Sequence, residues 1–217
     1  MKNLLIKELR LAASPLSYIF LSASLMTFLP GYPILMSAFF ICLGIFQSFQ
    51  SAREANDIQY SVLLPVAKRD VVRAKYLFVC LIELCGFCLC GAFTALRMTL
   101  LGNAAPYVTN ALMNANPVYL AFVLLIFASF NFLFVGGFFK TGYKFALPFV
   151  SFGAATLILV ALAETLRHIP ALAFLHTPSG ERLGLQFAAL GGAAAIYAAV
   201  TFLSCRRSER RFEKLDL

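Results

Sequence analysis

Long apolar runs, separated by short polar segments, make up most of the chain. An α-helix needs about 20 predominantly apolar residues to cross the hydrocarbon core of a bilayer. Six runs have this character, the first two only narrowly, at residues 14–31, 33–50, 76–101, 117–138, 145–166 and 184–205. The pattern predicts an all-α membrane protein with six transmembrane helices that form one transmembrane domain over residues 1–217.

The first 33 residues contain two further signals. Leu29–Pro33 contains two prolines and a glycine, which predicts that the first helix stops here and turns directly into the second. In residues 1–13, one helical face carries Asn3, Lys7 and Arg10 and another carries Leu5, Leu9 and Ala12. This pattern is typical of an amphipathic helix that lies in the membrane interface. A charged N-terminal extension is the alternative interpretation.

Most of the 18 basic residues fall on one side of the predicted bilayer. With the N-terminus inside, the inner segments contain Lys2, Lys7, Arg10, Arg53, Lys68, Arg69, Arg73, Lys75, Lys140, Lys144, Arg206, Arg207, Arg210, Arg211 and Lys214. The outer segments contain Arg167 and Arg182, and Arg97 lies within the third span. Because short cytoplasmic loops are enriched in Lys and Arg, we expect both termini to be cytoplasmic.

Composition excludes several classes of protein. With 61% hydrophobic and 13% charged residues and a mean hydropathy of +0.83, the chain has too little polar surface for a soluble protein of this length. The net charge of +8 lies mainly in the predicted inner loops, so we expect no nucleic-acid partner. Cys85 and Cys88 have the spacing of a metal-binding pair, but no second Cys or His pair accompanies them, and we expect no metal site.

The longest predicted inner segment, residues 51–75, changes character at Pro65. The proline biases Leu64 away from helix and allows a new helix just beyond it. From Lys68 onward the sequence can form an amphipathic turn that runs into the third span, with Lys68, Arg69 and Arg73 facing water or a partner. Before Pro65, a protein or the membrane interface must cover several apolar side chains, namely Ile58, Tyr60, Val62, Leu63 and Leu64.

The stretch LPVAKRDVVRAKYL at residues 64–77 resembles the LPVSRxxIVxxKYL signature that follows the second span in small ABC-2-type transporter permeases. This group includes the membrane subunits of phenol-soluble modulin exporters. The predicted topology is similar along the whole chain. One departure is Ala67, where the family usually has Ser. A Ser would cap the following helix, and its loss costs about 0.5–2 kcal/mol of helix stability.

The resemblance implies that the short helix after span two is a coupling helix, which docks on a separate ATP-binding subunit. Its contact residues would be Leu64, Pro65, Lys68, Arg69, Asp70 and Arg73. The next inner loop would offer a smaller second contact through Lys140, Thr141, Gly142, Tyr143 and Lys144. The alternatives are a solvated positive flank and a plain turn, respectively, with no partner on either.

The function implied by the resemblance is that of a permease subunit of an ATP-driven exporter in a bacterial plasma membrane. We expect a second permease chain, identical or related, and a peptide or another amphipathic molecule as cargo. The chain has no phosphate-binding loop, since Phe139 stands where Gly must precede Lys140 and Thr141. We therefore expect no enzymatic activity and no cofactor in this chain, with ATP and Mg²⁺ on the partner. A stand-alone secondary transporter or a non-transporting accessory subunit are the alternatives.

Three ionisable residues fall inside predicted spans. Glu83 lies in the inner half of span three, Arg97 lies near the outer end of that span, and Glu164 lies near the outer end of span five. Such residues are costly in a membrane unless they face water or a partner. A salt bridge between Arg97 and Glu164, a role in a substrate pathway and simple snorkelling are the three interpretations.

Overall fold

A computed structural model describes residues 2–63, 65–102, 104–108, 110, 112–141, 144–166, 169 and 182–214. Every regular element in these ranges is a helix. The elements are α1 (Lys2–Lys7), η1 (Glu8–Ala12), α2 (Pro15–Ile19), η2 (Phe20–Phe28), α3 (Met36–Glu54), α4 (Asp57–Leu63), α5 (Lys68–Leu100), α6 (Ala105–Val108), α7 (Pro117–Ser129), η3 (Phe130–Val135), α8 (Gly136–Thr141), α9 (Ala146–Leu166) and α10 (Leu183–Phe212).

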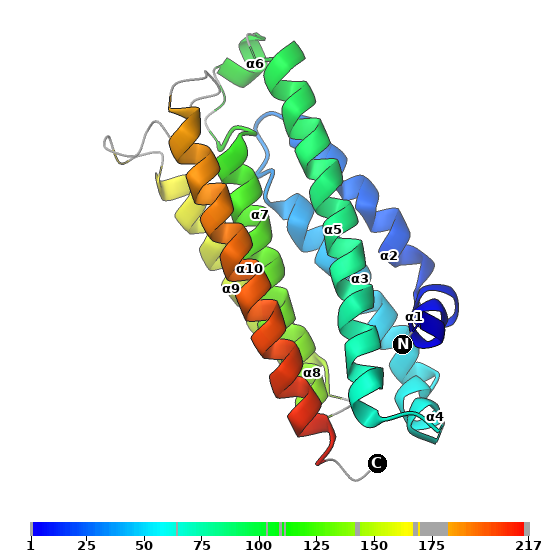
Figure 1. The fold of residues 1–217 in the computed structure, drawn as a ribbon. Coiled ribbons are helices and arrows are strands. Elements are labelled where there is room, and N and C mark those ends of the chain that lie inside the picture. Colours follow the sequence, from blue (N-terminus) through cyan, green and yellow to red (C-terminus); the bar gives the residue numbers. More distant parts are fainter. Residues whose placement is uncertain are drawn as a thin grey trace.

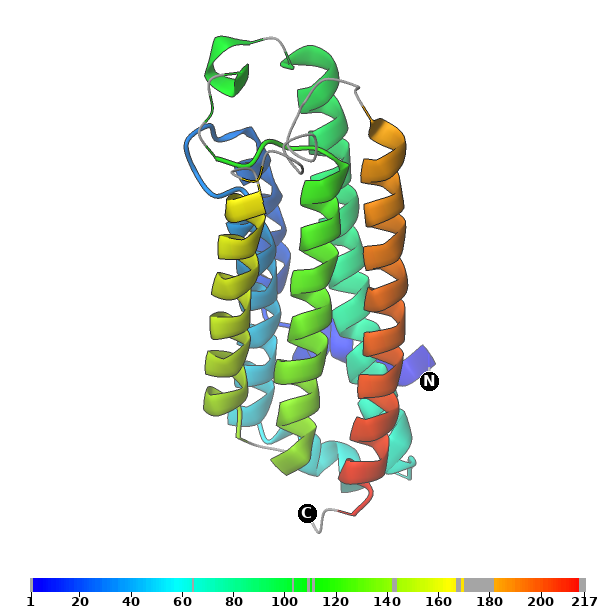
Figure 2. The same ribbon diagram turned by 90° about the vertical axis from the view of Figure 1, so that its left-hand side faces the viewer.

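The long helices run side by side in one bundle (Figure 1, Figure 2). One end of the bundle holds α4, the start of α5 and the ends of α8 and α10, and we call it the α4 end. The opposite end holds α6, and we call it the α6 end. The predicted all-α architecture is confirmed for the described residues.

Four helices are long and apolar enough to cross a membrane, namely α5, the continuous α7–η3–α8 helix, α9 and α10. A fifth span results if the bent pair Asn3–Ala12 and Pro15–Phe28 counts as one. Six spans were expected, but the first two were narrow. Neither of these two runs forms a single helix that is long and apolar enough. Helix η2 already ends at Phe28, and the second half of α3 is polar, with Gln47, Gln50 and Arg53.

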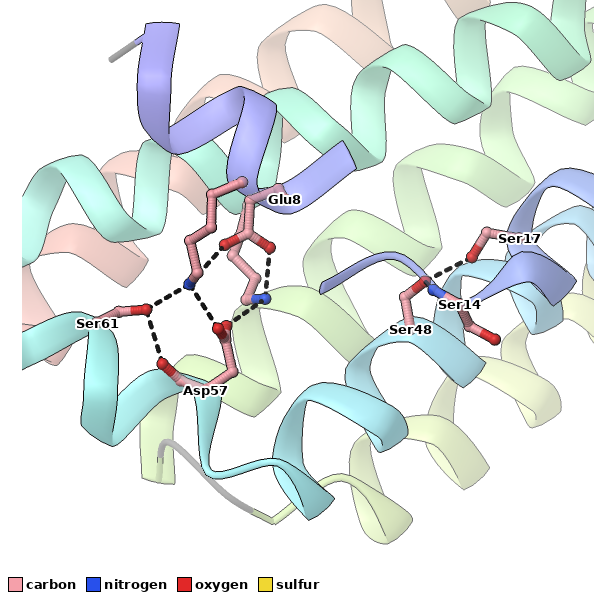
Figure 3. A network of polar contacts seen from close by, with 8 residues as sticks. Glu8, Ser14, Ser17, Ser48, Asp57 and Ser61 are labelled. Carbon is pink, nitrogen blue, oxygen red and sulfur yellow. Dashed lines mark hydrogen bonds and ion pairs between the residues drawn. The ribbon is translucent and has the colours of Figure 1, made fainter. Parts of the chain in front are cut away.

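The N-terminal helices turn sharply before the bundle begins. The α1–η1 segment and the α2–η2 segment meet at an angle of 92°. Ser14 caps α2 by accepting a hydrogen bond from the Leu16 N–H, and Pro15 follows at the first helical position. The Ser14 N–H donates to Ser48 Oγ at 2.7 Å (Figure 3), which holds the turn against α3.

The predicted turn between the first two runs is present. It follows η2 and precedes α3, and Gly31 adopts a φ of 73°, which glycine accepts without steric cost. Farther along, a Cβ on Gly44 of α3 would lie 2.8 Å from the Cβ of Phe20. The absent side chain therefore permits η2 to pack closely on α3.

Phenylalanine rings fill the core. Phe46 stacks on Phe149 with ring centroids 4.0 Å apart, and Phe49 meets Phe134 and Phe138 edge-on. The α7–η3–α8 helix lies innermost, with 72% of its most apolar window buried, compared with 17% for α9 and 11% for α10. Helices α9 and α10 thus present apolar surface outward, as membrane-facing helices do.

Candidate functional site

The segment expected to dock a partner divides into two helices. Residues Asp57–Leu63 form the short helix α4, and Lys68 begins α5, which continues without a break to Leu100. Lys68, Arg69, Asp70 and Arg73 thus lie in the first turns of a long helix, and the short helix after α3 precedes them. Pro65 is exposed between the two helices, whereas Leu64 lies outside the described residues. Ala67 occupies the N-cap of α5 and makes no side-chain capping bond there.

The cations at the start of α5 face acidic residues at the end of α10. Arg73 forms a two-pronged contact with Glu209, with Nε–Oε1 at 2.8 Å and Nη2–Oε2 at 3.3 Å. Arg69 pairs with Glu213, and both of those side chains are substantially exposed. Asp70 lies 3.9 Å from Arg73. The exposed Arg69–Glu213 pair contributes little stability, so a partner can take the place of either member at small cost.

A buried group of charges joins α4 to the N-terminal helices and to α5 (Figure 3). We call Lys7, Glu8, Asp57 and Lys75 the charge cluster. Lys75 Nζ lies 2.6 Å from Glu8 Oε2 and 3.2 Å from Asp57 Oδ2. Lys7 Nζ lies 2.5 Å from Asp57 Oδ1 and donates to Ser61 Oγ on α4. Lys75 and Glu8 are 3% and 2% exposed, which makes this a buried and nearly balanced network.

The pKa of Asp57 depends on its burial and on the two neighbouring lysines. Burial raises the pKa of this carboxyl, but the positive charges of Lys75 and Lys7 and their hydrogen bonds outweigh burial and leave the pKa below its ordinary value. Asp57 is therefore ionised at neutral pH. It attaches the first turn of α4 to both lysines.

The outer side of α4 is apolar and exposed. Tyr60 is 66% exposed and Leu63 is 81% exposed, whereas Ser61 on the inner side is 1% exposed. The sequence indicated that Tyr60 and Leu63 would need a cover, and within the described residues they have none. A short helix with two large apolar side chains at one end of a bundle is a typical contact surface for another protein.

The second predicted loop lies at the same end of the bundle. Lys140 and Thr141 close α8, and the Lys144 N–H donates to Thr141 Oγ1 at 3.0 Å. Gly142 and Tyr143 lie outside the described residues. The two segments expected to form contacts are therefore both at the α4 end (Figure 1).

Comparison with protein-family models gives one match, to the ABC-2 family transporter proteins, over residues 3–208. This chain belongs to that family. It is a multi-pass membrane protein and a permease, that is, a membrane transport component. Comparisons with curated proteins and with solved structures give no match.

At the α6 end of the permease, Arg97 and Glu164 have partners other than each other. Arg97 donates to the Thr27 carbonyl and to Asn114 Oδ1, and its guanidinium lies 4.2 Å from the centre of the Tyr107 ring. Glu164 accepts from the Met113 N–H at 2.9 Å. Of the three interpretations, the direct salt bridge is not present in the described structure, where Arg97 contacts Thr27 and Asn114 and Glu164 contacts Met113.

Glu83, the third residue of this set, lies at the contact of α5, η3 and α10. It is 1% exposed, and it accepts hydrogen bonds from Asn131 Nδ2 and Tyr197 Oη, each at 2.8 Å. Beside it, a groove of about 530 Å³ runs between α5 and α10. Its walls include Cys80, Tyr197 and Thr201 near Glu83, and Arg73 and Glu209 nearer the α4 end.

The charge cluster itself was not predicted from the sequence. A signal for it exists in the spacing of Val71, Val72, Lys75, Tyr76 and Val79, which lie on one face of a helix. All five are buried. A lysine on an otherwise apolar stripe indicates a buried acidic partner, although the spacing cannot say that Glu8 and Asp57 supply it.

Proposed function

We propose that this permease is the membrane subunit of an ATP-driven exporter and that α4 is its coupling helix. The exposed apolar side of α4, with Tyr60 and Leu63, carries the proposal. Family membership supports it, since the family is one of ABC transporters. ATP and Mg²⁺ would bind to a separate ATP-binding subunit, and the cargo would be a peptide or another amphipathic molecule.

The proposed topology puts the α4 end in the cytoplasm of a bacterial cell. In that arrangement α2–η2 and α3 are two further spans, giving six, with both termini inside. The 92° bend before α2 supports this, because it turns α1–η1 across the bundle axis, as an interfacial helix requires. The basic residues concentrated at the α4 end support the same orientation.

In the proposed mechanism, ATP-driven closure of two ATP-binding subunits moves α4 in each of two permease chains, identical or related. The charge cluster would transmit this movement, because Asp57 on α4 is bonded to Lys75 on α5 and to Lys7 on α1. Lys75 in turn holds Glu8 of η1. A displacement of α4 would therefore pull on a long bundle helix and on the N-terminal helix together.

The test compares two versions of the docking surface. The tagged permease is purified from its own host, and the co-purifying ATP-binding subunit is recognised by mass spectrometry through its phosphate-binding loop. We expect Tyr60→Asp with Leu63→Asp to abolish the complex. Charge reversal at Lys68, Arg69 and Arg73 should weaken the complex less, because two of these cations face α10.

The matched control is Val108→Asp, which alters an exposed apolar side chain at the α6 end and should leave the complex intact. If the Tyr60 and Leu63 changes leave the complex intact while charge reversal removes it, docking belongs to the start of α5 and not to α4. Transport by reconstituted vesicles in the absence of ATP and of any partner would overturn the exporter assignment.

A further inference from the structure

Glu83 is buried in the middle of the bundle without a counter-charge. No ion pair in the described part of the chain includes it. The groups that face it are Asn131 from η3, Tyr197 from α10, Cys80 from its own helix and Cys42 from α3. Each of these is neutral at physiological pH in its ordinary state. An ionised carboxylate in such surroundings is strongly disfavoured, and the usual outcome is the neutral acid.

The hydrogen-bond network around Glu83 has more acceptor oxygens than donor hydrogens. Oε2 accepts from both Asn131 and Tyr197, but Oε1 is buried with no partner among the described residues. Asn131 Oδ1 is a second buried oxygen that has no partner in the described part of the chain. Two unpaired acceptors at one site are a deficit of donors, and protonation of a carboxylate converts one acceptor oxygen into a donor.

We propose that Glu83 is a proton-binding site inside the bundle and is a neutral carboxylic acid at physiological pH. Binding transfers one proton from hydronium to a carboxylate oxygen: an O–H bond of hydronium breaks, an O–H bond forms on Glu83, and a neutral water molecule remains. The inference does not depend on an ATP-binding partner. It assigns to Glu83 a role that is neither a salt bridge nor a docking contact.

The groove between α5 and α10 provides a route for the proton, because Tyr197 lines it and donates directly to Glu83 Oε2. Thr201 also lines the groove and accepts from Asn131 Nδ2 at 3.1 Å. From the other side, Tyr76 Oη lies within hydrogen-bonding distance of the hydroxyls of Ser204 and Ser208, and Ser204 donates to the Asn131 carbonyl at 2.8 Å. These hydroxyls end at the Asn131 carbonyl, which has no proton to pass on, so they position Asn131 and do not carry the proton.

The π-helical turn η3 makes this arrangement possible. Asn131 lies in η3, and a π-turn within an α-helix alters the regular backbone bonding and often marks a functional position. Here the Asn131 carbonyl accepts from Ser204, while its amide side chain reaches Glu83 and Thr201. Three helices therefore meet at one protonated carboxyl. Water that entered through the groove would solvate the carboxylate and accept the proton. Loss of the proton would weaken the contact of α5 with η3 and α10 at Glu83.

Infrared difference spectroscopy tests the proposal on the purified full-length protein in lipid vesicles. The spectrum of Glu83→Gln is subtracted from that of the wild type at pH 7, in H₂O and in D₂O. We expect the variant to lose one carbonyl band of a protonated carboxylic acid, and this band should shift in D₂O. Glu209→Gln is the matched control, because Glu209 pairs with Arg73, and it should lose an ionised carboxylate band.

Loss of an ionised carboxylate band from Glu83→Gln would overturn the proposal. The amide of Gln has the shape of the neutral acid, so we expect this variant to fold as the wild type does. If it does not fold, Glu83→Asp serves instead, because its carbonyl band should be shifted yet remain that of a protonated acid. An ionised band in Glu83→Asp would then count against the proposal.

Discussion

Helix α5 buries Lys75, Glu83 and Arg97, and the first two of these have opposite kinds of surroundings. Lys75 near the α4 end is held by the carboxylates of Glu8 and Asp57, whereas Glu83, about 12 Å farther along the helix, accepts from the neutral donors Asn131 and Tyr197. The chain thus supplies full counter-charges where the helix leaves the bundle core. Deeper in the bundle it supplies hydrogen bonds alone. Lys75 therefore stays charged, and Glu83 is the group for which we infer a bound proton.

The two sites also depend differently on their neighbours. In a buried ion pair the loss of one member leaves an uncompensated charge, which is expensive. Around a neutral acid the loss of one donor leaves a dipole unsatisfied, which costs less. The contrast makes Lys75 the more sensitive position.

Lys75→Met should have the largest effect. It leaves Glu8 and Asp57 buried with Lys7 as their remaining cation, and breaking a buried ion pair costs about 3–5 kcal/mol. We expect a clear fall in the thermal unfolding midpoint of the detergent-solubilised protein, followed by circular dichroism. Lys7→Met is the control and should cost less, because the Lys7 side chain is 21% exposed. Equal midpoints for Lys75→Met and the wild type would refute a stabilising role for the cluster.

Asn131→Leu should have an intermediate effect. It removes one donor to Glu83 and the donor to Thr201 Oγ1. A buried polar group left without a partner costs about 1–3 kcal/mol.

Tyr197→Phe removes the hydrogen bond to Glu83 with little change of shape, so we expect a loss of about 0.5–1.5 kcal/mol. For Asn131→Leu and Tyr197→Phe alike, the loss is measured from the thermal unfolding midpoint, followed by circular dichroism. Losses as large as that of Lys75→Met would indicate that Glu83 is ionised.

Acid should loosen α4 through Asp57. The folded-state pKa of Asp57 lies below the unfolded value of about 3.9, so its contribution is complete above that pH and is lost as the pH falls through the folded-state pKa. We expect pepsin to cleave the wild type near α4 more slowly than Asp57→Asn at about pH 5, and the two rates to become equal at about pH 2.5. In Asp57→Asn, cleavage near α4 should already be fast at the higher pH. If the wild type is cleaved as fast as Asp57→Asn at the higher pH, Asp57 does not hold α4 in place.

Apolar length located the later helices well, because a run that crosses a bilayer has few alternatives. The predicted runs 117–138 and 145–166 correspond to Pro117–Thr141 and Ala146–Leu166. The ends were less accurate. Helix α10 extends past its predicted apolar run to Phe212, since an amphipathic turn with Glu209 continues the helix where the apolar run has stopped. Helix α5 begins at Lys68, where the sequence predicted an amphipathic turn that runs into the third span.

The site was less accessible to sequence reasoning than the fold. The segment before Pro65 carried a visible apolar excess, and Tyr60 and Leu63 are indeed exposed. The partners of Lys75 could not be predicted, because Glu8 is 67 positions away and only the packing of η1 on α5 brings the two together. The same limit applies to Arg97, whose contacts with Thr27 and Asn114 depend on loop geometry.

Arg69→Ala should have the smallest effect and so sharpens the distinction between buried and exposed charges. Its pair with Glu213 joins the same two helices as the Arg73 contact, but the Arg69 and Glu213 side chains are 55% and 36% exposed. Water and salt screen such a pair, and its formation restricts two long side chains, so the net contribution is near zero. We expect the unfolding midpoint of Arg69→Ala to equal that of the wild type at both low and high salt. A fall as large as that of Lys75→Met would mean that the pairs at the α4 end act as one network, and the contrast between Lys75 and the exposed cations would then be lost.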